Sequence, residues 1–477
     1  MKFRTLLIIA IYCCFVATSF AQTRDVVTDA FSSQLDSLVE ASLPQGSHVG
    51  IYAYDLTDDQ PLYAYEAEKL SRPASTMKLI TAISALAHPQ GKEPFRTEVW
   101  YRGNIEQDTL CGDIYVVGSM DPEFNNEALD SLVNMMTTLP FCYVKGNLYG
   151  DVSMKDSIYW GKGWSWDDNP NAYQPYLSPL MLQKGAVEIA VTPTTKGMPA
   201  DVLLTPVSTY YTITNNTQTA TPDAGKFVFS RNWLENGNDL IVSGNVERKR
   251  TTRVNIYEPE KFFMHTLQER LEACGMQFSN RYAFKEMLPI DSCSLLMAYE
   301  TPIQAVLDEM MKESDNLNAE AMLYRLAWQA TGKRHLSSDE AIKLLQERIE
   351  ALGYKASNYR IVDGCGLSNY NAVSPELLVA FLRFAYSQPD IYPAIYQALP
   401  IAGIDGTLQS RMRRGSPAYK NVRAKTGTVT GICTLAGYLT ASNGHQIAFA
   451  ILNQNHLAHR DARLLQDRVC EFLCGYR

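Results

Sequence analysis

The sequence predicts an α/β (α+β) fold in which one catalytic domain is interrupted by a large insertion. Strand and helix patterns are mixed near both ends of the chain, whereas residues 188–247 form short β-type runs separated by Pro, Gly, Asn and Thr turns. Two chemically related motifs, Ser75-Thr76-Met77-Lys78 and Ser314-Asp315-Asn316, lie far apart in the sequence. Neighbouring walls of one active site do not need such a separation, so we interpret the middle region as an insertion.

The N-terminal part is predicted to contain two strands and a helix. Residues 49–56 alternate and are rich in β-branched and aromatic side chains, and residues 62–65 begin a second strand after a polar turn. A helical pattern then extends to about Ala87, and Pro73 just before it suits a helix start. Ser75 is therefore expected near the beginning of this helix.

The remaining elements follow from the same patterns. The middle region is predicted to contain strands at 99–104 and 113–117, helices at 125–139 and 258–274, and an irregular segment at 160–176. The C-terminal region is predicted to contain two helices within 302–330, a helix at 337–352, strands at 422–428, 433–440 and 446–453, and a last helix from about Arg460. Ser314 falls at the junction of the first two of these helices, and Lys425 lies on the first strand.

Ser75 and Lys78 form a candidate nucleophile and base. They lie one helical turn apart on the same face. A serine hydroxyl is a weak nucleophile until a base removes its proton, and a lysine does this only as a neutral amine. The pKa of Lys78 must therefore be lowered by burial or by a nearby cation, a role that Lys425 could fill.

Two further motifs complete the candidate site. Ser314 could relay a proton between Lys78 and the leaving group, and Asn316 could hold Lys78 and a substrate amide together, whereas Asp315 is expected to be structural. In Lys425-Thr426-Gly427-Thr428, Lys425 offers a positive charge to a substrate carboxylate, and Thr426 and Thr428 offer hydroxyls. Gly427 permits close approach of a ligand to the strand. The backbone N–H groups of Ser75 and Thr428 could form an oxyanion hole.

The three motifs together match the set shared by β-lactamases and penicillin-binding proteins. Over nearly its whole length the chain resembles the class C, low-molecular-mass penicillin-binding proteins, which are D-alanyl-D-alanine carboxypeptidases of serine peptidase family S13. The strings that carry the resemblance are Pro73-Ala74-Ser75-Thr76-Met77-Lys78, Gly118-Ser119-Met120-Asp121-Pro122, Asp363-Gly364-Cys365-Gly366-Leu367-Ser368, Leu399-Pro400-Ile401-Ala402-Gly403-Ile404-Asp405-Gly406-Thr407-Leu408 and Lys425-Thr426-Gly427-Thr428.

The resemblance implies a transpeptidase-like catalytic domain with two smaller nested domains. We place the catalytic domain at residues 22–90 and 293–477, an insertion domain at 91–186 and 250–292, and an inner β-rich domain at 187–249. It also implies an exported carboxypeptidase or endopeptidase that acts on peptidoglycan stem peptides, forms an acyl-enzyme on Ser75 and binds β-lactams covalently, with no cofactor.

Two positions concern substrate choice. Asp167 and Asp168 resemble an acidic position of the family that meets the free amine of the substrate, although a solvated loop is an alternative for them. Many members of the family carry an arginine where this chain has Asn369. The subsite formed by that arginine is therefore not expected here.

The N-terminus is predicted to be a signal peptide, residues 1–21. A charged start with Lys2 and Arg4 precedes an apolar run and a small-x-small site before Gln22. Cleavage lowers the formal net charge from −8 to −10, which argues against nucleic acid as a partner. No later segment is apolar enough to span a membrane, so we expect a soluble periplasmic or otherwise exported chain.

Cysteine and histidine spacing predicts no metal site. No Cys-x-x-Cys string occurs, and His456 and His459, which could share a helix face, have no evident third ligand. Eight cysteines follow the signal segment, and we expect Cys111 to pair with Cys142, and Cys274 with Cys293.

Two other functions are alternatives for a chain with these motifs. A β-lactamase or esterase could use the same scaffold if deacylation were fast, although the large insertion argues against it. A non-catalytic protein that binds peptidoglycan or senses β-lactams would have no need for both Ser75 and Lys78.

Overall fold

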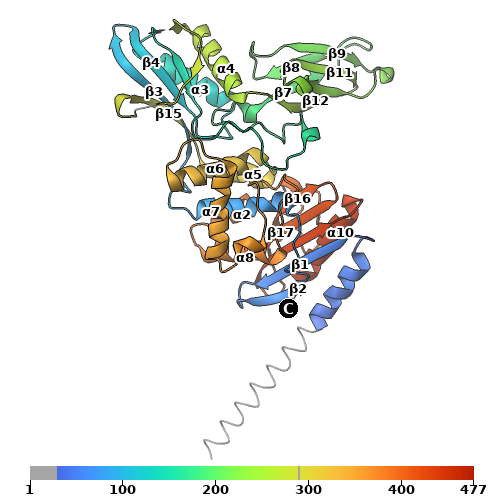
Figure 1. Cartoon of the computed structure of the whole chain (residues 1–477). Coiled ribbons are helices and arrows are strands. Elements are labelled where there is room, and N and C mark those ends of the chain that lie inside the picture. Colours follow the sequence, from blue (N-terminus) through green and yellow to red (C-terminus); the bar gives the residue numbers. More distant parts are fainter. Residues whose placement is uncertain (1–29, 288–289) are drawn as a thin grey trace, which may run out of the picture. The chain divides into compact units, whose positions relative to one another are not determined.

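The computed structural model describes residues 30–287 and 290–477, and the predicted signal segment lies outside them. Figure 1 labels the helices and strands of the chain. The chain divides into two compact units, which we describe separately. Unit 1 comprises the described part of Met1–Pro73 together with Val373–Tyr386 and Pro400–Arg477. Unit 2 comprises Ala74–Ala372 and Ser387–Leu399.

Unit 1 is built on a five-stranded antiparallel sheet. The strands lie in the order β16 (Arg423–Val429), β17 (Ile432–Thr440), β18 (Gln446–Gln454), β1 (His48–Asp55) and β2 (Gln60–Tyr65). The helices of this part are residues 30–42, α8 (Pro375–Ser387) and α10 (His459–Cys474).

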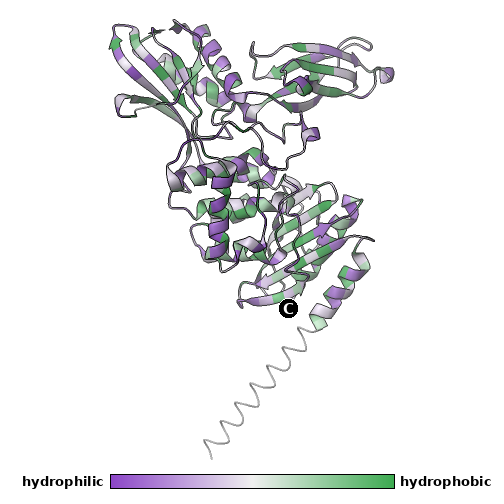
Figure 2. Ribbon diagram, in the orientation of Figure 1, coloured by the Kyte–Doolittle hydropathy of each residue, from purple (hydrophilic) through white to green (hydrophobic). Residues whose placement is uncertain are grey.

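The central strands of this sheet are buried on both faces. Almost every residue of β17 and β18 is buried, and both strands are predominantly hydrophobic (Figure 2). Leu465, Val469 and Leu473 recur at helical spacing on α10 and enter the same core as Leu35 and Val39 of the N-terminal helix. The two terminal segments therefore stabilise the sheet that carries the Lys425 motif.

Unit 2 contains the nucleophile helix within a group of helices. The group comprises η1 (Ala74–Thr76), α2 (Met77–Leu86), α5 (Ile303–Lys312), α6 (Asn316–Thr331), α7 (Ser338–Ala351) and α9 (Tyr392–Ala398). Every residue of α2 is buried, and the helix packs against α5, α6 and α7. Most residues of α2 are apolar, which suits its place at the centre of the group.

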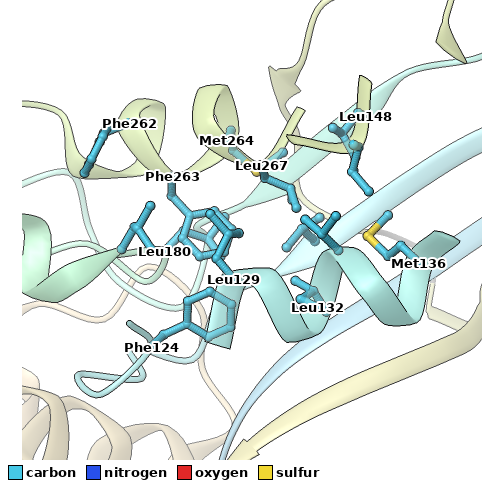
Figure 3. Close-up of a cluster of buried hydrophobic side chains, with 14 of the residues drawn as sticks. Phe124, Leu129, Leu132, Met136, Leu148, Leu180, Phe262, Phe263, Met264 and Leu267 are labelled. Carbon is cyan, nitrogen blue, oxygen red and sulfur yellow. The ribbon is translucent and has the colours of Figure 1, made fainter. Parts of the chain in front are cut away.

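A seven-stranded sheet in the same unit is covered by two helices. Its strands are β3 (Phe95–Glu106), β4 (Thr109–Val117), β5 (Tyr143–Val144), β6 (Leu148–Asp151), β13 (Gln277–Phe278), β14 (Ala283–Phe284) and β15 (Ser294–Thr301). Side chains of α3 (Asn126–Thr137) and α4 (Pro259–Ala273) pack together in this core (Figure 3). The rings of Phe124 and Phe263 lie 5.1 Å apart within it.

Two three-stranded sheets form the β-rich part that the sequence predicts near residues 188–247. One contains β7 (Ala186–Thr192), β8 (Asp201–Thr205) and β12 (Arg250–Asn255). The other contains β9 (Ile213–Thr219), β10 (Val228–Arg231) and β11 (Leu240–Val246). Both contribute to one small core, to which Ile189 and Val242 belong. The predicted strands are confirmed, while the predicted domain boundaries stay a prediction.

The predicted disulfide bonds are wrong in this structure. No disulfide joins the eight cysteines that the structure describes. Thr109 is in parallel register with Tyr143, so Cys142 lies beside Asp108 and Cys111 lies three positions further along β4. Three residues of strand span about 10 Å, which is too far for a disulfide.

Within residues 30–287 and 290–477, no helix has the length and apolar character that crossing a membrane requires.

Candidate active site

Ser75 and Lys78 come together at the start of α2, as the sequence predicts. Ser75 lies in the 3-10 turn η1, and Lys78 follows in the first turn of α2. The Nζ of Lys78 is 2.9 Å from the Oγ of Ser75. Ser75 is half-buried, whereas the side chain of Lys78 is fully buried. The two atoms are therefore within proton-transfer distance.

Three oxygen atoms hold the amine of Lys78. Besides Ser75, the Oδ1 of Asn316 lies 2.6 Å from Nζ and the backbone carbonyl oxygen of Cys365 lies 2.8 Å away. Burial lowers the pKa of Lys78 below its ordinary value, although nearby acidic groups such as Asp315 oppose the shift. A lowered pKa increases the population of the neutral amine, which is the form that can accept a proton from Ser75.

Two buried carboxylates fix the loop that presents the Cys365 carbonyl. Glu320 of α6 accepts hydrogen bonds from the backbone N–H groups of Gly364 and Cys365, both at 2.8 Å. Asp363 accepts hydrogen bonds from the N–H of Gly366 at 2.9 Å and from the indole of Trp164 at 3.0 Å. Burial, followed by the charge of Asp363, raises the pKa of Glu320 to about 7.

Gly366 lets this loop pack directly on the nucleophile turn. Its φ of +82° is in the left-handed region, and a Cβ there would lie 1.8 Å from the carbonyl oxygen of Ala74. Ala74 itself, just before Ser75, has a φ of 44°. The Asp363–Gly366 segment and the turn that carries Ser75 are therefore fitted to each other through a position that requires glycine.

The Ser314-Asp315-Asn316 motif links α5 to α6. Ser314 is half-buried and has a φ of 64°, a conformation that a non-glycine residue rarely adopts. Asp315 caps α6 by accepting from the N–H of Asn318 at 3.1 Å, which agrees with its expected structural role. Asn316 reaches Lys78, and its Nδ2 donates to the carbonyl of Tyr173 at 2.7 Å. One of its amide hydrogens is thus used within the protein.

Lys184 forms a mostly buried polar centre beside this motif. Its Nζ lies 2.8 Å from Glu123, 3.0 Å from Asp315, 3.2 Å from Glu309 and 3.3 Å from the Oδ1 of Asn318. Burial opposes its charge, but Asp315, Glu123 and Glu309 outweigh that effect and raise the pKa of Lys184. This lysine joins the region before β7 to the first turn of α6. Sequence analysis missed it, because an isolated lysine in a loop carries no pattern.

Asp167 and Asp168 lie in the short turn η2 (Trp166–Asp168). Asp167 is exposed, whereas Asp168 is half-buried and accepts a hydrogen bond from the hydroxyl of Tyr173 at 2.7 Å. Since the carbonyl of Tyr173 holds Asn316, Asp168 is connected to the Lys78 group through one residue. The free-amine role of both aspartates stays a prediction.

The Lys425 motif lies on β16 in unit 1, as predicted. Lys425 is fully buried, and its Nζ donates to the carbonyl of Thr426 at 2.8 Å. The hydroxyl of Thr426 donates to that of Thr407, in η8 (Gly406–Leu408), at 2.7 Å. Gly427 is buried and Thr428 is exposed. Thr407 belongs to a string that carried the family resemblance, but its contact with Thr426 was not foreseen.

His456 and His459 lie beside a cysteine that the sequence spacing does not indicate, while the expectation of no metal site stays a prediction. Cys433 of β17 lies beside them, with its Sγ 3.5 Å from the Nδ1 of His459. The three side chains come from β17, from the loop after β18 and from the first residue of α10. Their sequence spacing matches no metal motif, because the strand and the helix come together only in the folded unit.

Comparison with known proteins identifies the family. The family described as D-Ala-D-Ala carboxypeptidase 3 (S13) matches residues 31–474. The chain belongs to this family. It is a serine carboxypeptidase of the penicillin-binding type, as the resemblance implied.

Curated relatives extend over most of this S13 carboxypeptidase. A D-alanyl-D-alanine carboxypeptidase of an Actinomadura species is 29% identical over 440 residues, covering 88% of this chain and 80% of the relative. The D-alanyl-D-alanine carboxypeptidase DacB of Haemophilus influenzae is 25% identical over 413 residues, covering 85% of each chain.

Solved structures show the same fold. The crystal structure of penicillin binding protein 4 (dacB) from Haemophilus influenzae matches with a TM-score of 0.79 and 22% identity, covering 93% of this S13 carboxypeptidase and 99% of that chain. The same protein in complex with a β-lactam matches with a TM-score of 0.73, covering 92% and 97%. The predicted fold class, a transpeptidase-like α/β fold with inserted domains, is confirmed.

Proposed function

We propose that this carboxypeptidase removes the terminal D-alanine of peptidoglycan stem peptides through an acyl-enzyme on Ser75. The observation that carries the proposal is the 2.9 Å approach of a buried lysine amine to the Ser75 hydroxyl. A serine next to an amine whose pKa is lowered has the base that nucleophilic catalysis requires. In a cross-linked peptide the same reaction is an endopeptidase step.

The reaction begins with proton transfer from Ser75 to Lys78. The Ser75 oxygen forms a bond to the carbonyl carbon between two D-alanines, and the bond from that carbon to nitrogen breaks. Ser314 passes the proton to the leaving amine, which departs as D-alanine. Water then hydrolyses the ester, returning the proton to the Ser75 oxygen. Asn316 keeps the amine of Lys78 in position throughout.

Substrate binding is assigned to two further groups. Lys425 binds the terminal carboxylate of the stem peptide, and Thr426, Gly427 and Thr428 bind its backbone through hydroxyl and main-chain groups. Asp167 and Asp168 bind the free amine of a long stem-peptide side chain. β-Lactams, which carry a carboxylate and a strained amide, acylate Ser75 in the same way. No cofactor takes part in these steps.

The site of action is outside the cytoplasm. The predicted signal segment before Gln22 supports export to the periplasm or beyond, where peptidoglycan is found. The acidic net charge of −8 disfavours nucleic acid as a partner.

A combined labelling and product assay tests the proposal. The chain from Gln22 onward is incubated with a fluorescent penicillin and, separately, with a pentapeptide that ends in D-Ala-D-Ala. We expect stable labelling and release of D-alanine, with neither in Ser75→Ala. Rapid turnover of the penicillin would instead indicate a β-lactamase. Absence of labelling in the folded wild-type chain would indicate a non-catalytic binding protein.

A further inference from the structure

Unit 1 contains three potential metal ligands that converge on one point. The Nε2 of His456 lies 3.0 Å from the Nδ1 of His459, and the Sγ of Cys433 lies 3.5 Å from the same nitrogen. All three ligand atoms are within 4.8 Å of one another. Cys433 is 1% exposed, His456 is 3% exposed and His459 is half-buried.

These separations fit tetrahedral coordination. Zinc–sulfur and zinc–nitrogen bonds of about 2.3 and 2.0–2.1 Å give ligand separations of about 3.6 Å from sulfur to nitrogen and about 3.3 Å between nitrogens. The distances of 3.5 and 3.0 Å within the cluster are close to these values. One thiol and two imidazoles are also a donor set that Zn²⁺ prefers.

Two other groups of acidic, cysteine or histidine side chains lie as close together, but their oxygens are used by the protein. Glu320 and Asp363 accept hydrogen bonds from the backbone of the Gly364–Gly366 loop. Asp55 accepts from the N–H groups of Thr57 and Asp58 and contacts His445. Both groups therefore have structural partners.

The ligand atoms of the histidine cluster contact chiefly one another, since the Nε2 of His456 and the Sγ of Cys433 both lie beside the Nδ1 of His459. The Nδ1 of His456 is buried and has no hydrogen-bond partner in the part of the chain that the structure describes. The ligand atom of this ring is the other nitrogen, Nε2, which lies beside the Nδ1 of His459. The imidazole is held by the backbone, where the N–H of His456 donates to the carbonyl of Gly431 at 3.3 Å. The backbone therefore positions the buried ring with its Nε2 in the cluster.

The charges around the histidine cluster restrict which cation can bind. His459 is the first residue of α10, and the positive end of a helix disfavours a cation there. Arg463, one turn further along α10, contacts Thr428 at 3.4 Å and adds a second positive charge nearby. Only a cation that binds thiolate strongly overcomes this repulsion, which favours Zn²⁺ over Mg²⁺ or Ca²⁺.

We propose that Cys433, His456 and His459 bind one Zn²⁺ ion. On binding, the Cys433 thiol releases its proton to solvent, both imidazoles ligate as neutral rings, and water completes the coordination. Cys433 is the register partner of Thr428 on β16, and α10 (Figure 1) begins at His459. The ion therefore fastens the start of β17, which pairs with the end of the strand that carries the Lys425 motif, to the start of α10.

Cobalt spectroscopy tests the site without relying on activity. The reduced, metal-free chain from Gln22 onward is titrated with Co²⁺ alone. We expect the thiolate-to-cobalt charge-transfer band and the strong visible bands of tetrahedral cobalt to saturate at one equivalent. One equivalent of Zn²⁺ should then remove both. In wild type, Zn²⁺ should also raise the melting temperature.

The variants decide where the ion binds. Cys433→Ser should lose the charge-transfer band and bind Zn²⁺ at least about tenfold more weakly. Cys274→Ser, which changes an exposed thiol, should behave as wild type. His459→Ala provides a second ligand variant if circular dichroism shows that Cys433→Ser is unfolded. A wild-type chain without a one-equivalent band, or a folded Cys433→Ser or His459→Ala variant that keeps it, would overturn the proposal.

Discussion

The Oδ1 of Asn316 lies 2.6 Å from the Nζ of Lys78, which makes it the shortest of the three contacts that hold the amine. The other end of the Asn316 amide is fixed by the carbonyl of Tyr173. The buried lysine is therefore positioned by a neutral group, which does not oppose the lowering of its pKa as a carboxylate would.

Asn316→Asp should shift the pH dependence of acylation. The acylation rate rises with pH as Lys78 loses its proton, and burial places this rise below the ordinary pKa of lysine. A carboxylate at position 316 favours the charged amine, raises the pKa of Lys78 and moves the rising limb to higher pH. Stopped-flow penicillin acylation across pH measures this. Asn358→Asp adds a charge at an exposed position and should leave the profile in place. If wild type, Asn316→Asp and Asn358→Asp had the same dependence of acylation rate on pH, the assigned role of Lys78 would be contradicted.

Lys184→Met should destabilise the protein and slow acylation. It leaves Glu123, Glu309 and Asp315 without their shared cation. Because these side chains are only partly buried, the cost should lie between the about 1 kcal/mol of an exposed ion pair and the about 3–5 kcal/mol of a fully buried one. Denaturant unfolding and penicillin labelling measure the two effects. Lys162→Met is the matched control, because it removes an exposed ion pair with Asp339 and should change little. Equal stability of the two variants would show that Lys184 does not hold the Asp315 motif.

Glu320→Gln should alter the dependence of stability on pH. The folded-state pKa of about 7 lies above the usual value of 4.5, so the folded protein holds this proton more tightly than the unfolded chain. The contribution of Glu320 to the free energy of unfolding is fully present below pH 4.5 and is lost as pH rises through 7. Relative to the variant, wild type should lose up to about 3 kcal/mol of unfolding free energy over this pH window.

Urea unfolding at several pH values measures this difference between wild type and Glu320→Gln. The control Glu347→Gln, at an exposed position, should have the same pH dependence of stability as wild type. If the difference in unfolding free energy between wild type and Glu320→Gln did not change with pH, the raised pKa of Glu320 would be refuted.

Replacing Asp167 and Asp168 together with asparagine should affect peptides selectively. A partly exposed ion pair contributes about 1 kcal/mol, so turnover of peptides with a free side-chain amine should fall several-fold. Acylation by simple penicillins should be nearly unchanged, since asparagine at position 168 can still accept from Tyr173. An equal loss on both substrates would indicate that these residues act only through the Tyr173–Asn316 connection.

Local patterns predicted most of the secondary structure. Helix α2 begins two residues after Ser75, α4 spans Pro259–Ala273, and β16, β17 and β18 lie within a residue or two of their predicted positions. These elements depend on hydrophobic periodicity and on residues such as Pro73, which act within a few positions. The Ser75–Lys78 contact was predictable for the same reason, because one helical turn fixes it.

Contacts between distant segments could not be predicted in this way. Lys184 acquires its partners Glu123 and Asp315 only after β-rich and helical segments have packed together, and Glu320 finds the Gly364 loop only through the position of α6. Cys433 reaches His459 because β17 packs against α10. In each case the residues are polar and separated, so neither spacing nor periodicity marks them.

The position of a covalent β-lactam adduct shows which residue is the nucleophile. The chain from Gln22 onward is labelled with a penicillin, digested and analysed by tandem mass spectrometry, with Ser75→Ala and Ser84→Ala treated in parallel. We expect one adduct, on Ser75, which is absent from Ser75→Ala and present in Ser84→Ala. An adduct on any other residue, or labelling that persists in Ser75→Ala, would contradict it.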